Sequence, residues 1–222
     1  RRALAELSIG LLIGSQLLLG YPQCVWFTAL TACFFLTWRY FQLRSPLKQI
    51  ATIAVAVVSG VAIGAVQWAA TLHLLSNSIR KSVDAAFFNE GSLHPLNLVQ
   101  LVAPYLFKTR VVGQNTHELG LYIGAFPLAL CVWLLSNRNS WGRHRKLIRA
   151  LIIFGILSLL LATGEYGGLY RLQLLIPLVN RLRFPCRAIA LVQFCAAAIA
   201  GVALSVLKTY AKNHAGRANC AA

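Results

Sequence analysis

The sequence predicts an all-α fold: a polytopic bundle of about six transmembrane helices, with a short interfacial helix in its first long outer loop. Four stretches of the 222-residue chain hold no Asp, Glu, Lys or Arg: 7–38, 49–79, 119–137 and 188–207. A helix needs about 20 mostly apolar residues to cross a bilayer core of about 30 Å. Four such stretches exceed what the core of one small soluble domain can hold. The stretches also lack the apolar/polar alternation of a membrane strand, so helices are expected.

Glycines, prolines and charges set the bounds of the expected helices. Gly20 and Pro22 interrupt the first apolar stretch with a turn signal, which favours two helices there, although one kinked helix fits the same residues. Gly60 and Gly64 have the four-residue spacing that lets membrane helices approach closely. Within a single transmembrane domain over 1–222, the expected helices are 4–19, 23–41, 49–72, 118–136, 147–163 and 188–207, and the outer loops are 73–117 and 164–187.

The distribution of basic residues predicts the orientation in a cell membrane. The chain has 21 Lys and Arg against 5 Asp and Glu, and thirteen of the basic residues lie at the termini, in the loops 42–48 and 137–149, and at Arg39 just before the first of these loops. By the positive-inside rule, these short basic segments are cytoplasmic and the two long loops are extracytoplasmic. The same positions favour membrane lipids as partners and exclude nucleic acid, which needs a basic face on a soluble domain.

A short polar pattern in the first outer loop predicts the interfacial helix. His94, Asn97 and Gln100 recur every three residues with Leu and Val between them, and Pro95 suits a first helical turn. This pattern is typical of an amphipathic helix lying in the membrane interface. A helix packed against the outer rim of the bundle fits the pattern equally well.

Outer arginines are the candidate binding residues. Arg181, Arg183 and Arg187 precede the last expected helix, and Arg80 follows the third. The planar guanidinium fork suits phosphate oxygens, so these four predict a lipid-phosphate site. Two alternatives stay open: the arginines reach ordinary headgroups, or Arg80 only complements a helix C-terminus.

Asp84 and Glu118 are weak catalytic candidates, since an outer carboxylate can act as a base or hold a divalent cation. Glu118 would equally stabilise the start of a helix. No metal site is predicted, because the six cysteines are scattered without a CxxC pair. They are expected to be packing residues in membrane helices.

Several segments match a known series of motifs in order. They lie at 16–23, 74–80, 92–98, 103–107, 118–128 and 169–187. The series resembles the bacterial YfhO-type membrane proteins, although His94, Leu96 and Cys186 depart from the family's Pro, Trp and Ala.

The resemblance implies a protein similar to GT-C glycosyltransferases, which transfer a sugar from a polyprenyl-phosphate donor to a cell-envelope acceptor on the outer face of the cytoplasmic membrane. The family's catalytic acid is expected in an early outer loop that precedes Arg1, so the chain would be an internal fragment without its catalytic residue. A lipid or solute transporter, or flippase, and a non-catalytic assembly protein are the alternatives. Nearly charge-free helix interiors and the absence of an inverted repeat weigh against the transporter.

Overall fold

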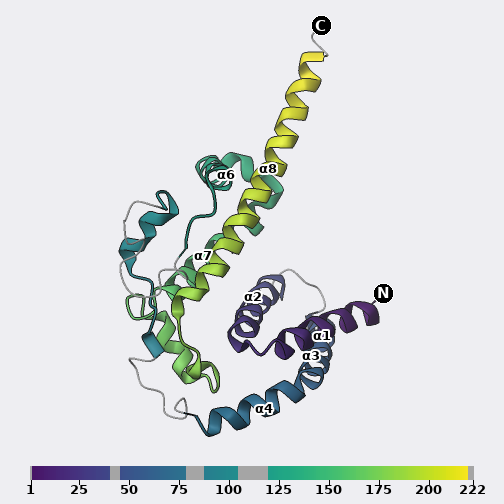
Figure 1. Cartoon of the computed structure of the whole chain (residues 1–222). Coiled ribbons are helices and arrows are strands. Elements are labelled where there is room, and N and C mark those ends of the chain that lie inside the picture. The colour runs from purple at the N-terminus through teal and green to yellow at the C-terminus, as the bar shows by residue number, and fades with distance from the viewer. Residues whose placement is uncertain (1, 41–45, 79–87, 105–119, 220–222) are drawn as a thin grey trace. The chain divides into compact units, whose positions relative to one another are not determined.

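The computed structural model describes residues 2–40, 46–78, 88–104 and 120–219, and every regular element in these ranges is a helix (Figure 1). The predicted all-α class is therefore confirmed. The chain divides into two compact units, each described by itself. The first comprises Arg1–Phe88 and Gln173–Arg183, and the second comprises Asn89–Leu172 and Phe184–Ala222.

The described residues of the first unit include the α-helices α1 (Arg2–Leu18), α2 (Pro22–Tyr40), α3 (Pro46–Ile63) and α4 (Ala65–Ser76). The break between α1 and α2 confirms the prediction of two helices. Gly20 turns the chain with a φ of 69°, a conformation that side chains disfavour. Pro22 then occupies the first helical position, where its missing N–H costs nothing.

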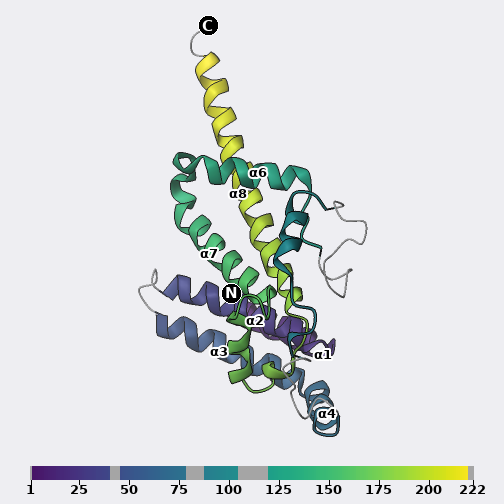
Figure 2. The same cartoon turned by 90° about the vertical axis from the view of Figure 1, so that its left-hand side faces the viewer.

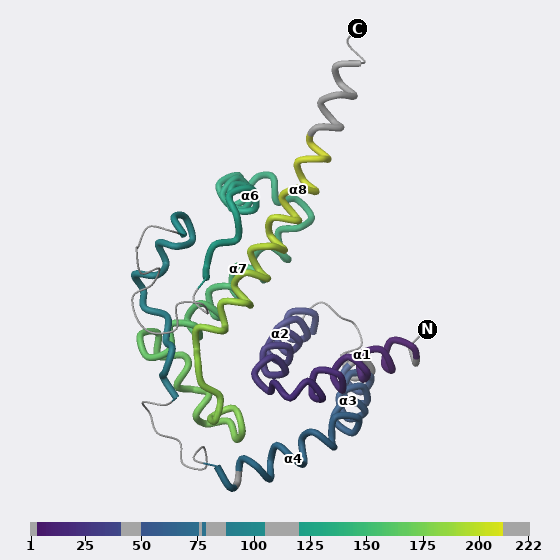
Figure 3. Tube along the Cα trace, viewed as in Figure 1, coloured from purple at the N-terminus to yellow at the C-terminus, as the bar shows by residue number. Residues whose placement is uncertain are grey.

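Glycines hold α1 and α3 together at close range, and the two helices lie side by side in Figure 1 and Figure 3. A Cβ added to Gly60 would lie 2.6 Å from the Cβ of Ile13 and 2.8 Å from the carbonyl oxygen of Gly10. Gly14 faces Ile63 in the same way, with a Cβ-to-Cβ separation of 2.8 Å. The close approach predicted at Gly60 is present, and it depends on glycines on both helices.

The helix expected over 49–72 is divided, which corrects the prediction of one straight helix. The segments Ile50–Ile63 and Ala65–Leu75 meet at an angle of 67°. Gly64 lies at the break, where an added Cβ would come within 2.5 Å of the Leu17 side chain. Glycine has low helix propensity, and the packing of Leu17 against its bare backbone favours the bend.

The second unit contains α6 (Ala125–Ser136), α7 (Arg145–Ala162) and α8 (Ile189–Asn219), and both α6 and α7 pack on α8 (Figure 2). Its shorter 3-10 helices are η2 (Pro95–Leu101), η3 (Arg138–His144) and η6 (Pro185–Ala188). Two further 3-10 helices are η4 (Leu169–Leu175), which crosses the division between the units, and η5 (Val179–Arg181) in the first unit.

Two predicted helix ends are wrong in this unit. The helix expected from residue 118 begins at Ala125, because Gly124 has a φ of 99° and the amide of Gln193 donates a 2.7 Å hydrogen bond to the carbonyl of Gly120. These features keep 120–124 non-helical. The last helix was expected to end at 207 and continues to Asn219, since no proline interrupts the polar tail.

One helical stretch, Pro185–Tyr210, is long and apolar enough to cross a membrane. The bent α3–α4 pair is a second if its two arms form one span. Two more apolar helices, Leu4–Leu18 and Ala125–Ser136, are shorter than a span. By length and composition, the described chain thus offers one membrane-length helix, or two with the bent pair.

Candidate functional site

Backbone hydrogen bonds fix the segment that leads into α8. The N–H of Phe184 donates to the carbonyl of Glu90 at 3.1 Å, and the N–H of Cys186 donates to Gly91 at 3.2 Å. Both acceptors lie in the turn before η2. The chain from 184 to 188 is therefore held by partners almost a hundred residues earlier in the sequence.

The same turn is tied to the end of α7. The N–H of Leu93 donates to Ala162 at 3.0 Å, and the N–H of Glu165 donates to the Ser92 hydroxyl at 3.2 Å. Gly164 has a φ of 54°, and a Cβ there would collide with Ser92 Oγ and come within 2.8 Å of Pro185. Only glycine fits this crossing of three segments, which we call the α8 junction: 89–94, 162–165 and 184–188.

Arg187 has a defined orientation in the α8 junction. Its guanidinium carbon lies 4.5 Å from the centroid of the Phe184 ring, within the range of a cation–π contact. Phe184 is a buried residue with φ 63°, a left-handed conformation that costs about 1–2 kcal/mol for a residue with a side chain. The surrounding hydrogen bonds maintain that conformation, and it sets the ring beneath the arginine.

The charge of Arg187 also affects the pKa of Tyr170 in η4. Burial raises the pKa of the Tyr170 phenol, the thiol of Cys186 raises it further, and the positive charge of Arg187 opposes the rise. Tyr170 is only 3% exposed, so its phenol remains protonated at neutral pH. Arg187 and the buried Cys186 thiol of the α8 junction therefore both act on a neutral phenol in η4.

The other predicted arginines belong to the first unit or lie outside the described residues. Arg181 and Arg183 are half-buried on the short segment Gln173–Arg183, and the Arg183 carbonyl accepts a 3.0 Å hydrogen bond from the Gln23 amide. Arg187 is in the second unit, so the structure does not describe the three as one cluster. Arg80, Asp84 and Glu118 all lie outside the described residues.

The η2 helix was predicted from its polar spacing, and the structure shows which face is buried. Asn97 is 0% exposed, whereas Leu96 is 60% exposed and Val102 is 73% exposed. The His94 imidazole caps the helix by accepting from the Leu96 N–H at 3.2 Å. The polar face thus points into the second unit and the apolar face points outward.

Sequence reasoning missed Tyr170, Gln23 and Gln173 as buried polar residues. Each is a single polar side chain in an apolar context, and no spacing marks it. Among the described residues, no group of three His, Cys, Asp or Glu side chains is placed to hold a metal ion. No disulfide joins the described cysteines, and Cys131, Cys186 and Cys195 are buried, as packing residues would be.

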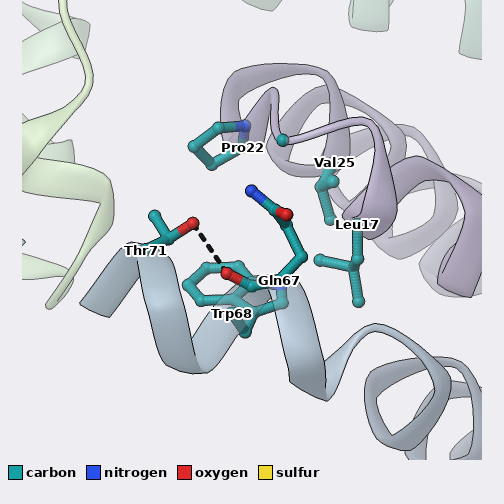
Figure 4. A pocket seen from close by; sticks show the side chains of 7 residues that line it. Leu17, Pro22, Val25, Gln67, Trp68 and Thr71 are labelled. Carbon is teal, nitrogen blue, oxygen red and sulfur yellow. Dashed lines mark hydrogen bonds between the residues drawn. The ribbon is translucent and has the colours of Figure 1, made fainter. Parts of the chain in front are cut away.

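A small pocket lies in the first unit between the α1–α2 turn and α4 (Figure 4). Its lining is Leu17, Gly20, Pro22, Val25, Gln67, Trp68 and Thr71. The Thr71 hydroxyl donates to the Gln67 carbonyl at 2.8 Å, and the Gln67 amide extends toward Pro22. The cavity volume of about 10 Å³ suits one water molecule and is too small for a lipid or a sugar.

Fold and junction together define an all-helical protein with a membrane-length helix and an oriented arginine at the start of that helix. Comparison with protein-family models, with curated proteins and with solved structures finds no match to this chain.

Proposed function

We propose that this chain is part of a multi-pass membrane protein in which α8, the α3–α4 pair and the shorter apolar helices lie in the bilayer. Large apolar side chains on several helices support the proposal. Val58 is 68% exposed on α3 and Val66 is 81% exposed on α4, and many Leu residues of α1 are also exposed. A water-soluble monomer rarely shows contiguous apolar surface beyond a few hundred Å².

The polarity of η2 supports the same proposal. A helix with Asn97 and Gln100 buried and Leu96 and Val102 exposed is the reverse of a helix at a water-facing surface. In a lipid environment the exposed side chains contact acyl chains while the amides keep protein partners. We therefore propose that η2 is the interfacial helix of an extracytoplasmic loop, and that the short basic loops are cytoplasmic.

We propose, further, that the protein is a GT-C-like glycosyltransferase that takes a sugar from a polyprenyl-phosphate donor and passes it to a cell-envelope acceptor. The motif resemblance to the YfhO-type family supports the activity. Arg187 is oriented over Phe184 at the start of a membrane-length helix, and this observation supports a binding site for the donor's phosphate. A lipid phosphate needs a cation at headgroup depth with its tail free to enter the bilayer.

The chemistry of transfer gives the arginines their role. An acceptor hydroxyl oxygen bonds to the sugar's anomeric carbon and gives its proton to a base. The bond between that carbon and the phosphate oxygen breaks, and negative charge grows on the departing lipid phosphate. The Arg187 guanidinium, with Arg181, Arg183 and Arg80, would stabilise that charge more strongly than the charge of the intact donor. The positive end of the α8 dipole acts in the same direction. Asp84 and Glu118 stay weak candidates for the base, with a divalent cation possible beside them.

Binding of a short-chain polyprenyl phosphate to detergent-purified protein tests the donor site. The variant is Arg181→Ala/Arg183→Ala/Arg187→Ala, and the control is Arg39→Ala/Arg171→Ala, which changes basic residues outside the predicted site. Saturable binding that is lost only in the first variant supports the proposal. Equal binding by both, or none by the wild type, contradicts it and favours the non-catalytic assembly protein.

One observation favours a lipid or solute transporter as the second candidate. The 67° break at Gly64 divides an apolar helix, and discontinuous helices are common at transporter binding sites. Proteoliposomes distinguish the two functions. Movement of a labelled polyprenyl phosphate across the bilayer without an acceptor favours the transporter, whereas sugar transfer without such movement favours the glycosyltransferase.

A further inference from the structure

The connection between α6 and α7 carries a dense basic surface in the second unit. Its five exposed cations are Arg138, Arg143, Arg145, Lys146 and Arg149. All five fall within twelve residues of sequence. We call this surface, together with the exposed Lys208 of α8, the basic collar.

A buried tryptophan fixes the backbone of the collar. Trp141 is 6% exposed, and its indole N–H donates a 2.7 Å hydrogen bond to the carbonyl of Leu134 at the end of α6. The Ser140 N–H donates to Asn137 at 2.9 Å, and Gly142 reverses the chain with a φ of 42°. Arg138 and Arg143 therefore project from a 3-10 turn with a defined shape, and Arg145, Lys146 and Arg149 follow at the start of α7.

The described second unit offers the collar no neutralising carboxylate. Its described acids are Glu90 and Glu165, and both belong to the α8 junction or its edge. The junction meets the end of α7, and the helix from Arg145 to Ala162 rises about 25 Å. That distance exceeds the screening length of about 8 Å at physiological salt, so the acids do not offset the collar's charge.

Packing sets the collar at the opposite end of α8 from Arg187. Trp141 and Ile148 share one hydrophobic cluster with Ala203 of α8, and Leu207 packs against that cluster. From Arg187 to Lys208 the chain rises about 32 Å, close to the thickness of a bilayer core at about 30 Å. When α8 crosses the bilayer with Arg187 in one headgroup layer, the collar lies in the opposite headgroup layer.

We infer that the basic collar is a docking surface for the headgroups of acidic phospholipids. The six cations lie on η3, at the start of α7 and on α8, and the described second unit offers them no carboxylate partner. At headgroup depth they complement the phosphodiesters of an anionic leaflet. The inference needs only the membrane placement of α8, so it rests on that part of the proposed function and not on sugar transfer. Lipid phosphodiester, and not free phosphate, is the ligand, because only a leaflet presents several phosphates at once.

Titration of short-chain phosphatidylglycerol into protein in a neutral detergent tests the inference, with binding followed by thermal stabilisation. The collar variant replaces Arg138, Arg143, Arg145, Lys146 and Arg149 with Gln and leaves Lys208 unchanged. The matched control is Arg39→Gln/Arg171→Gln, which changes two described basic residues outside both the collar and the proposed donor site. We expect the apparent affinity to fall about tenfold or more in the collar variant and to stay near the wild-type value in the control.

Short-chain phosphatidylcholine and inorganic phosphate at the same concentrations should give no thermal stabilisation. Salt at about 0.5 M should abolish the stabilisation by phosphatidylglycerol, because it screens the charges of the collar. Inorganic phosphate matching phosphatidylglycerol would overturn the inference, as would undiminished affinity in the collar variant. If that variant does not fold, the milder pair Lys146→Gln/Arg149→Gln, which lies in α7 and leaves the residues of η3 unchanged, replaces it with an expected intermediate loss. Failure here leaves the polyprenyl-phosphate test unaffected, because that test depends on loss of binding in the Arg181/Arg183/Arg187 variant, which leaves the collar intact.

Discussion

The indole N–H of Trp26 donates a 2.9 Å hydrogen bond to the side-chain oxygen of Gln173, 147 residues further along the chain. The Gln23 amide makes a second link at 3.0 Å, to the carbonyl of Arg183. Both donors come from α2, and both acceptors belong to the returning segment Gln173–Arg183 of the same unit. These two bonds fix the two ends of the segment that carries Arg181 and Arg183.

Replacement of Trp26 by Phe should destabilise the first unit by about 1–3 kcal/mol, because the buried Gln173 oxygen loses its donor. The matched control is Trp38→Phe. Trp38 lies on the same helix, and its described contact is a tilted ring packing with Phe35 at 5.7 Å. Thermal unfolding in detergent should show a lower midpoint for Trp26→Phe than for Trp38→Phe. Equal midpoints would mean that the hydrogen bond adds no stability.

The α1–α3 contact should not tolerate a methyl group. In Gly60→Ala the new Cβ would meet Ile13 and the Gly10 backbone at separations that real atoms do not reach, so the helices must move apart. We expect a loss of about 1–3 kcal/mol. Gly201→Ala in α8 is the control, since open space surrounds that position, and it should stabilise by about 0.5–1 kcal/mol through helix propensity. Similar effects of the two changes would contradict the close packing.

The α8 junction should be sensitive to Gly164 for reasons of space as well as backbone conformation. Gly164 and Gly168 both have positive φ, at 54° and 73°, but only Gly164 is surrounded by other atoms. Gly168→Ala should cost about 1–2 kcal/mol from backbone strain alone. Gly164→Ala should cost about 1–3 kcal/mol more, because its methyl group collides with Ser92 and Pro185. Circular dichroism melts of the two variants measure the difference.

Much of the helical plan could be predicted from local signals. The Gly20–Pro22 turn is a two-residue signal that needs no tertiary information. The close approach at Gly60 follows from residue size alone, since glycine is the residue that lets two backbones meet. Both features were predictable because the sequence near each position determines them.

Other features depend on distant residues and were not predictable. The bend at Gly64 arises where Leu17 of another helix packs on it, and an isolated glycine in an apolar run is usually tolerated. The spacing of Asn97 and Gln100 identifies one face of η2, but only the fold determines that this face is buried. The charge of Arg187 acts on the pKa of Tyr170, which lies 17 positions earlier in the sequence, and no local pattern relates the two residues.

Tyr170 should make stability depend on alkaline pH. Burial, its largest influence, raises the pKa of the phenol above the ordinary value of about 10, and the unfolded chain keeps that ordinary value. Above pH 10 the unfolded state therefore releases a proton that the folded state retains. The contribution of the neutral phenol is fully present below pH 10 and is lost as pH rises toward the folded pKa, by at most about 1.4 kcal/mol per pH unit.

Comparison of unfolding midpoints between pH 9 and pH 11.5 measures this loss. The wild type should fall more steeply with pH than Tyr170→Phe, which has no phenol to ionise. Tyr122→Phe removes an exposed phenol of the same unit and should keep the wild-type slope. Arg187→Gln should also keep the wild-type slope in this range, because burial alone keeps the folded phenol protonated there and the slope follows ionisation of the unfolded chain. Parallel curves for wild type and Tyr170→Phe would show that solvent reaches the phenol and that the junction does not exclude water.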